Sequence, residues 1–208
     1  MNILILGATG KTGRHVLAQA LAAGHSVTAF VRDSTKLTPS QRLNVLVGDA
    51  QDSAQVREAA IGHDAVISAL GHTSLTTSSA LTNATRGAIE ALPANAKFIS
   101  LTGYGVTDPH DPKPSLAGSI LTGVIKLVPG EMFADGARHV DLLRKSTLSW
   151  TVIRAAVLTP GKATGKTELG YFKLSPQDTI SNADVAAAMV ACLTDNTWAK
   201  CAPMIRRA

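Results

Sequence analysis

A glycine-rich segment near the amino end, Gly7-Ala8-Thr9-Gly10-Lys11-Thr12-Gly13, constrains the fold more than any other feature of the sequence. It follows the apolar run Ile3–Leu6 and precedes a helical pattern over Thr12–Ala23, which Gly24 ends. Glycines allow a tight turn from strand to helix and let backbone N–H groups approach a pyrophosphate. A GxxGxxG motif between a strand and a helix therefore predicts a dinucleotide site. Its predicted contacts are Gly7, Thr9, Gly10, Lys11, Thr12 and Gly13.

The triplet Gly10-Lys11-Thr12 also resembles the end of a P-loop. A P-loop motif, GxxxxGK[ST], would need a glycine at position 5, where this chain has Ile5. The sequence therefore does not favour a nucleotide triphosphatase.

Short β-branched runs alternate with helical patterns along the whole chain, which indicates repeated β-α units and a parallel sheet. The sequence thus predicts an α/β fold with one doubly wound parallel sheet, a Rossmann fold, in a single domain over residues 1–208. Loops 72–79, 103–118 and 159–175 follow predicted strands and are expected to form a small substrate rim. The predicted strands are Ile3–Leu6, Ser26–Val31, Val45–Val47, Ala65–Leu70, Phe98–Leu101 and Thr151–Ile153. The predicted helices after the first are Ala54–Ile61, Leu81–Leu92, Phe133–Ser146 and one that Asn182 or Asp184 caps and that runs to Leu193.

Composition excludes several classes of protein. Hydrophobic residues make up 45% and charged residues 17% of the 208 residues, so the chain should bury a core. The net charge is only +5 and aromatic residues are 4%, so nothing indicates nucleic-acid binding. Two cysteines and six scattered histidines predict no metal site. The first apolar run lacks a preceding basic stretch, and no segment reaches the ~20 apolar residues of a membrane span, so a cytoplasmic protein without membrane contact is expected.

The end of the second predicted strand bears on the choice of cofactor. An NAD site places an acidic residue about 20 residues after the glycines, and here that position holds Arg32. A guanidinium matches a 2′-phosphate, so the sequence predicts NADP(H) in preference to NAD(H), unless Arg32 is only a solvated charge. Asp33 is expected to begin a turn. Further predicted cofactor contacts are Asp49 and Ala50 near the adenine and Ala69, Leu70 and Gly71 near the ribose; the alternative for both segments is a plain turn.

Several of these segments occur in the same order in a known family. The sequence resembles atypical short-chain dehydrogenases/reductases, and within them the NAD(P)H-binding group that includes flavin reductase/biliverdin-IXβ reductase. The segments that carry the resemblance are Gly7–Gly13, Val31-Arg32-Asp33, Gly48-Asp49, Leu70-Gly71, Leu142–Ser146, Val152-Ile153-Arg154 and Ile180–Ala186. The resemblance covers nearly the whole chain. It implies a Rossmann domain with a small or absent substrate subdomain and NADPH as the usual cofactor.

The sequence also departs from the family pattern. Catalytic short-chain dehydrogenases carry Tyr-x-x-x-Lys, but Tyr104 is followed four residues later by Asp108, and Tyr171 by Ser175. Reduction of an isolated carbonyl requires a positioned acid, whereas a flavin, quinone or similar planar acceptor gives a delocalised anion that water can protonate. The sequence therefore favours an NADPH-dependent reductase of a planar acceptor.

Candidate residues for that reaction lie after the fifth and sixth predicted strands. Thr102 and Tyr104 are the candidate catalytic residues, and Thr102 is also a candidate contact of the nicotinamide carboxamide. The candidate rim residues are His72, His110 and Arg154. Two alternatives remain: a non-catalytic NADP(H) sensor that binds a protein partner, and an isomerase or epimerase that uses bound NADP, although the latter usually requires the Tyr/Lys pair.

Overall fold

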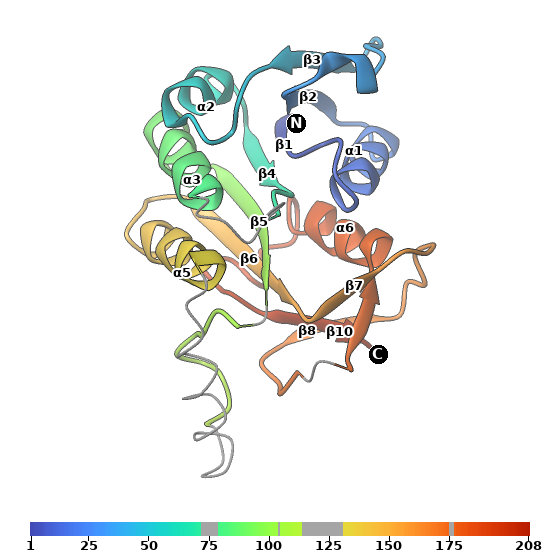
Figure 1. Ribbon diagram of the computed structural model, residues 1–208, viewed down its shortest axis with the longest axis vertical. Helices are drawn as coiled ribbons and strands as arrows, with labels where there is room; N and C mark the ends of the chain where they lie inside the picture. Colours follow the sequence, from blue (N-terminus) through green and yellow to red (C-terminus); the bar gives the residue numbers. More distant parts are fainter. Residues whose placement is uncertain (72–78, 104, 114–130, 175–176) are drawn as a thin grey trace.

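The computed structural model describes residues 1–71, 79–103, 105–113, 131–174 and 177–208. Its central strands are β1 (Asn2–Leu6), β2 (Ser26–Val31), β3 (Leu43–Val47), β4 (Ala65–Ser68), β5 (Lys97–Gly103), β6 (Ser149–Ala155), β8 (Thr167–Gly170) and β10 (Met204–Arg207). Within the described residues they form one sheet in the order β3-β2-β1-β4-β5-β6-β10-β8 (Figure 1). The first six strands run parallel in the order 3-2-1-4-5-6, so the predicted doubly wound fold is confirmed.

The sheet extends beyond the six predicted strands. Strand β10 pairs in parallel with β6, and β8 pairs antiparallel with β10 at the edge, so the sheet is not purely parallel. A separate two-stranded ribbon joins β7 (Val157–Thr159) to β9 (Thr179–Ser181). These strands are not predicted from the sequence because each has only three or four residues and little apolar periodicity.

Helices cover both faces of the sheet. The described helices are α1 (Gly13–Ala22), α2 (Ser53–Ala60), α3 (Ala80–Ala91), α5 (Glu131–Arg144), α6 (Asn182–Ala191) and the short η1 (Ser34–Lys36). Helices α1 and α6 pack together on one face, and α2, α3 and α5 lie side by side on the other (Figure 1). None of these helices is long and apolar enough to cross a membrane.

Strand β1 shows how the sequence fills both sides of the sheet. Ile3 and Ile5 belong to the core cluster that includes α1 and α6 residues, whereas Leu4 and Leu6 belong to the cluster with α2, α3 and α5. Successive side chains of a strand point to opposite faces, so a continuous apolar run is what a strand buried on both faces requires. The carboxyl ends of β1 and β4 are adjacent in the sheet, which brings the glycine-rich segment beside Leu70 and Gly71.

The structure confirms the turn predicted at Asp33 but not the residues predicted to cap α6. Asp33 begins a turn as predicted, because its carboxylate accepts a hydrogen bond from the Thr35 N–H at 3.0 Å. The predicted caps of α6 were wrong: Ser181 caps it, and its hydroxyl oxygen accepts a hydrogen bond from the Asp184 N–H at 2.9 Å. Asn182 and Asp184 lie inside the first turn and are buried.

Candidate functional site

The glycine-rich segment forms a tight turn between β1 and α1. Gly7 has φ +79°, a conformation that side chains disfavour, and its carbonyl accepts a hydrogen bond from the Gly10 N–H at 2.9 Å. A Cβ atom at Gly13 would lie 1.9 Å from the Gly7 carbonyl oxygen, so only glycine allows α1 to start this close to the strand. Both positions need glycine for a steric reason.

The start of α1 is open for an anion. Thr12 precedes the helix but makes no side-chain cap; its hydroxyl instead donates to Asn182 Oδ1 at 2.8 Å, between α1 and α6. Thr12 is therefore buried, and any contact it makes with a cofactor comes from its backbone. An uncapped helix start presents N–H donors and the positive end of the helix dipole, which suits a pyrophosphate.

A groove runs from this turn toward the ends of β2 and β3. Predicted contacts that line it are Gly7, Thr9, Gly10, Arg32, Asp49, Ala50, Ala69, Leu70 and Gly71. Phe30, Val31, Gln51 and Ala80 also line it, and the sequence analysis did not single them out for this role. Lys11 is exposed and lies outside this lining. The structure thus brings most of the predicted cofactor residues into one continuous groove.

Arg32 is the charged group that distinguishes one end of the groove. Its side chain is exposed, and among the described residues it has no hydrogen-bond or ion-pair partner. Asp49, by contrast, forms a turn of its own: its carboxylate accepts a hydrogen bond from the Gln51 N–H at 2.9 Å. Arg32 is therefore free to meet an anion in the groove.

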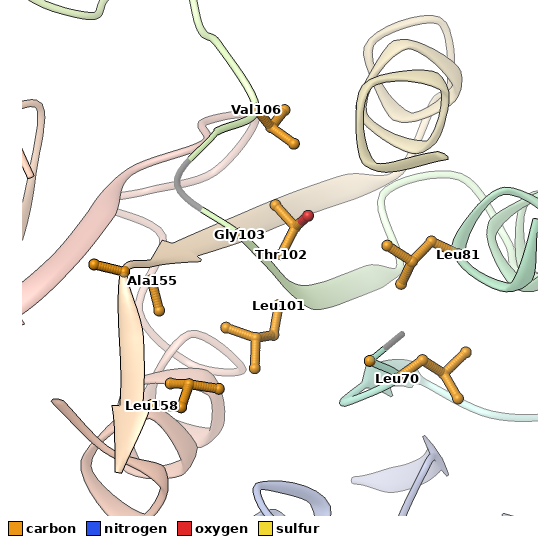
Figure 2. Close-up of a pocket in the computed structure, with 10 residues that line it drawn as sticks. Leu70, Leu81, Leu101, Thr102, Gly103, Val106, Ala155 and Leu158 are labelled. Atoms are coloured by element: carbon orange, nitrogen blue, oxygen red, sulfur yellow. The ribbon is translucent and has the colours of Figure 1, made fainter. Parts of the chain in front are cut away.

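A second hollow adjoins the groove and shares Leu70 and Gly71 with it (Figure 2). It lies at the carboxyl ends of β5 and β6, and Thr102 supplies the only polar side chain of its described lining. The remaining lining residues are Leu81, Leu101, Gly103, Val106, Ala155, Ala156 and Leu158. An apolar hollow beside a dinucleotide groove is where a second substrate would lie.

Helix α5 packs directly against Thr102. A Cβ atom at Gly136 would lie 2.9 Å from Thr102 Oγ1 and 2.8 Å from Val106 Cγ2, so the missing side chain leaves room for both. Within the described part of the chain, the Thr102 hydroxyl has no hydrogen-bond partner. It is therefore available to a bound molecule.

Deeper under β5 lies a second polar group, His139 of α5. It is fully buried, and its ring nitrogens lie 2.6 Å from Thr85 Oγ1 and 2.8 Å from Ser100 Oγ. Burial lowers the pKa of His139 to about 4, although the charge of Asp135 acts in the opposite direction. The ring is neutral at neutral pH and joins α3, α5 and β5.

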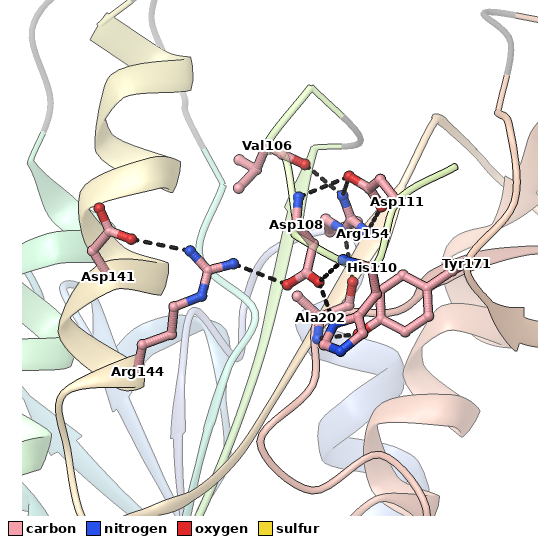
Figure 3. Close-up of polar contacts among 9 residues, drawn as sticks. All are labelled: Val106, Asp108, His110, Asp111, Asp141, Arg144, Arg154, Tyr171 and Ala202. Atoms are coloured by element: carbon pink, nitrogen blue, oxygen red, sulfur yellow. Dashed lines mark hydrogen bonds and ion pairs between the residues drawn. The ribbon is translucent and has the colours of Figure 1, made fainter. Parts of the chain in front are cut away.

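The loop that follows β5 is anchored by a polar network (Figure 3). Arg154, at the end of β6, is fully buried and donates hydrogen bonds to both carboxylate oxygens of Asp111 and to the Val106 and Ala202 carbonyls. Arg144 of α5 donates to Asp108 at 2.9 Å. Arg154, a predicted rim residue, is thus an interior anchor; the sequence could not show this because Asp111 lies 43 residues away.

The same network contains His110 and Tyr171. His110 Nδ1 lies 2.8 Å from Asp108 Oδ1, and its ring packs on Tyr171 at 5.1 Å between centroids. Burial opposes ionisation of Asp108, but hydrogen bonds from His110 and Arg144 outweigh it and lower the pKa of that carboxyl. Burial and the nearby Asp108 charge raise the pKa of Tyr171 to about 12. These side chains hold the loop and do not line the hollow.

Two predicted site residues, His72 and Tyr104, lie outside the described residues, as do parts of the three predicted rim loops. Among the described residues, no group of three or more histidine, cysteine, aspartate or glutamate side chains is placed to hold a metal ion.

Comparison with known proteins gives the same class of fold as the geometry. A family model described as NAD(P)H-binding matches residues 7–196. Two solved structures superpose on the chain: an anaerobillin reductase from Escherichia coli (TM-score 0.77, 23% identity, covering 100% of this chain and 97% of that one) and a short-chain dehydrogenase/reductase from Veillonella parvula in complex with NADP (TM-score 0.74, 18% identity, covering 99% and 94%). At these identities the likeness shows the fold alone.

Among curated sequences, the chain is 35% identical over 97 residues to an isoflavone reductase homolog from Zea mays, a match that covers 42% of this chain and 31% of that protein. It is 36% identical over 81 residues to a phenylcoumaran benzylic ether reductase from Pinus taeda, covering 34% and 26%. The chain thus spans less than a third of these relatives' length.

The doubly wound sheet and its glycine turn define a Rossmann-type dinucleotide-binding fold. The chain belongs to the NAD(P)H-binding family, whose model covers all but its two ends. The resemblance to an NAD(P)H-binding group that was drawn from the sequence agrees with this family.

Proposed function

We propose that this protein is an NADPH-dependent oxidoreductase that transfers hydride to a planar acceptor such as a flavin or a quinone. The observation that carries the proposal is the adjacency of two sites: a groove fitted to a dinucleotide and an apolar hollow that shares Leu70 and Gly71 with it. Adjacent binding would hold the acceptor against the cofactor, and proximity supplies much of the rate of such a transfer.

The residues of the groove fit NADPH by the chemistry of its parts. The glycine turn and the uncapped start of α1 would receive the pyrophosphate, and Arg32 would pair with the 2′-phosphate. A guanidinium with no partner of its own in the described structure can pair with that phosphate without breaking another interaction. This supports NADP(H) over NAD(H).

The hollow fits an acceptor that needs little acid catalysis. When bound, the nicotinamide supplies a hydride; the acceptor takes that hydride and a proton from water, so NADPH, acceptor and one proton give NADP⁺ and the dihydro acceptor. Thr102 would donate a hydrogen bond to the acceptor or to the carboxamide, and the apolar walls would exclude water from the contact. Because solvent supplies the proton, the reaction does not need a Tyr-x-x-x-Lys pair, which the sequence lacks.

Calorimetric titration with NADPH and NADH tests the cofactor assignment. Arg32→Ala should weaken NADPH binding roughly 10- to 100-fold, the effect of losing a hydrogen bond to a charged group worth about 1.5–3 kcal/mol. NADH binding should be unchanged. Arg42→Ala, which removes an exposed arginine just before β3 and away from the groove, is the matched control. An NADPH affinity that Arg32→Ala alters less than about twofold would refute the assignment.

A further inference from the structure

The lining of the hollow carries information about the charge of the acceptor. None of its ten described lining residues is charged, and Thr102 alone among them has a polar side chain. Leu70, Leu81, Leu101, Val106 and Leu158 line the same hollow (Figure 2). An anionic group placed against these walls would lose its hydration without gaining a counter-charge, which opposes its binding.

Two arginines of the described structure near the loop after β5 are already paired. Arg154 precedes the lining residue Ala155 at the end of β6, but its side chain is fully buried and is paired with Asp111. Arg144 of α5 is paired with Asp108 and Asp141. Neither guanidinium can turn toward an anion in the hollow without breaking its ion pair with a carboxylate.

We propose that the acceptor is a neutral ring bearing a carbonyl oxygen, of the quinone or unphosphorylated flavin kind, and not an anionic flavin nucleotide or tetrapyrrole. The inference rests on the proposed reductase function and names the substrate class of the same site. The Thr102 hydroxyl, without a partner in the described structure and given room by Gly136, would donate to the carbonyl oxygen of the ring. The apolar walls would contact the two faces and the edge of the ring.

Lumiflavin and FMN provide a matched pair of acceptors. Both carry the same reactive ring, and they differ in the ribityl phosphate, so their comparison measures the effect of the whole polar, anionic tail, and the charge variant described below tests the contribution of its charge. Steady-state oxidation of NADPH should show a KM for lumiflavin about tenfold below that for FMN, with similar kcat, since desolvating an unpaired charge weakens binding. Menadione, a neutral quinone, should be reduced as well.

Two neighbouring residues of β7 offer a variant and its control. Leu158 lines the hollow and is 38% exposed, whereas Val157 is 40% exposed and does not line it. Leu158→Lys places a cation at the mouth and should lower the ratio of the KM for FMN to the KM for lumiflavin by about threefold to tenfold. Val157→Lys adds the same charge away from the hollow and should leave both values unchanged.

The outcomes separate this inference from the proposed function. An equal or lower KM for FMN than for lumiflavin in the unsubstituted protein would overturn the neutral-acceptor inference while leaving the reductase function standing. If Leu158→Lys and Val157→Lys change the KM for FMN equally, the phosphate tail does not meet the hollow. This result would also overturn the neutral-acceptor inference. Binding of NADPH without oxidation by any of the three acceptors would refute the reductase function, and the inference with it.

Discussion

Mild acid should destabilise this protein through His139. The buried ring has a pKa of about 4 in the folded state, against 6.5 for an exposed histidine. As pH falls below about 6.5, the unfolded chain takes up a proton that the folded chain does not, so folding stability declines until the folded pKa is reached. The contribution of His139 to the free energy of unfolding is therefore fully present above about pH 6.5, and it is lost progressively between about pH 6.5 and about pH 4.

The size of the loss follows from the pKa difference. One pKa unit corresponds to about 1.4 kcal/mol, so moving from about pH 7 to about pH 5 should cost about 2 kcal/mol through this residue alone. Most carboxylates stay ionised in that interval, which makes it a clean window for a histidine.

Urea denaturation at both pH values, on the wild type and on His139→Gln, measures this contribution. Glutamine keeps a donor and an acceptor beside Thr85 and Ser100 but does not titrate. The variant should lose about 2 kcal/mol less stability than the wild type between the two pH values. His15→Gln, on α1 and away from this cluster, should retain the wild-type loss. If His139→Gln and the wild type decline in parallel, the reasoning about the buried neutral ring is wrong.

Three further predictions concern the turn and the anchored loop. Gly13→Ala should abolish NADPH binding in calorimetry, because its Cβ would lie 1.9 Å from the Gly7 carbonyl oxygen; retained affinity would contradict the close approach of α1. Asp111→Asn should lower the free energy of unfolding by about 3 kcal/mol by leaving the buried Arg154 without its counter-charge, whereas Glu168→Gln, at an exposed pair, should cost less than about 1 kcal/mol. The lowered pKa of Asp108 gives stability that is present above its unfolded pKa and lost as pH falls through the folded pKa. Wild type should thus lose more stability than Asp108→Asn between about pH 5 and about pH 3, and equal losses would remove Asp108 as the cause.

The parts of the fold and groove that the sequence predicted depend on local requirements. Gly7 and Gly13 are needed by the turn itself, and the apolar run of β1 is needed by a strand buried on both faces, so each requirement can be recognised without knowing the rest of the chain. The end of β2 lies beside the same turn because consecutive β-α-β units pair in a known order, which is why Arg32 lines the groove.

What the sequence did not predict depends on distant partners. Arg154 is an anchor because of Asp111, and His139 is neutral because residues of other elements bury it. Tertiary contacts of this kind leave no periodic pattern in the sequence.

The walls of the hollow were missed for a different reason. Leu101 and Leu158 have the same chemistry as any core leucine, and only the placement of β5 and β7 in the fold brings them to a cavity. The edge strand β8 was missed because its residues, Thr167–Gly170, have no apolar run.

The proposed reductase function can be tested by mixing the protein anaerobically with NADPH and menadione and recording the nicotinamide absorbance. If the protein is a reductase of planar acceptors, one NADPH should be oxidised per quinone reduced. The rate should depend on protein concentration and should fall to the protein-free value with the Gly13→Ala variant. Tight NADPH binding with no oxidation above the protein-free rate, for menadione and for both flavins, would contradict the proposed reductase function and would favour a cofactor-binding sensor.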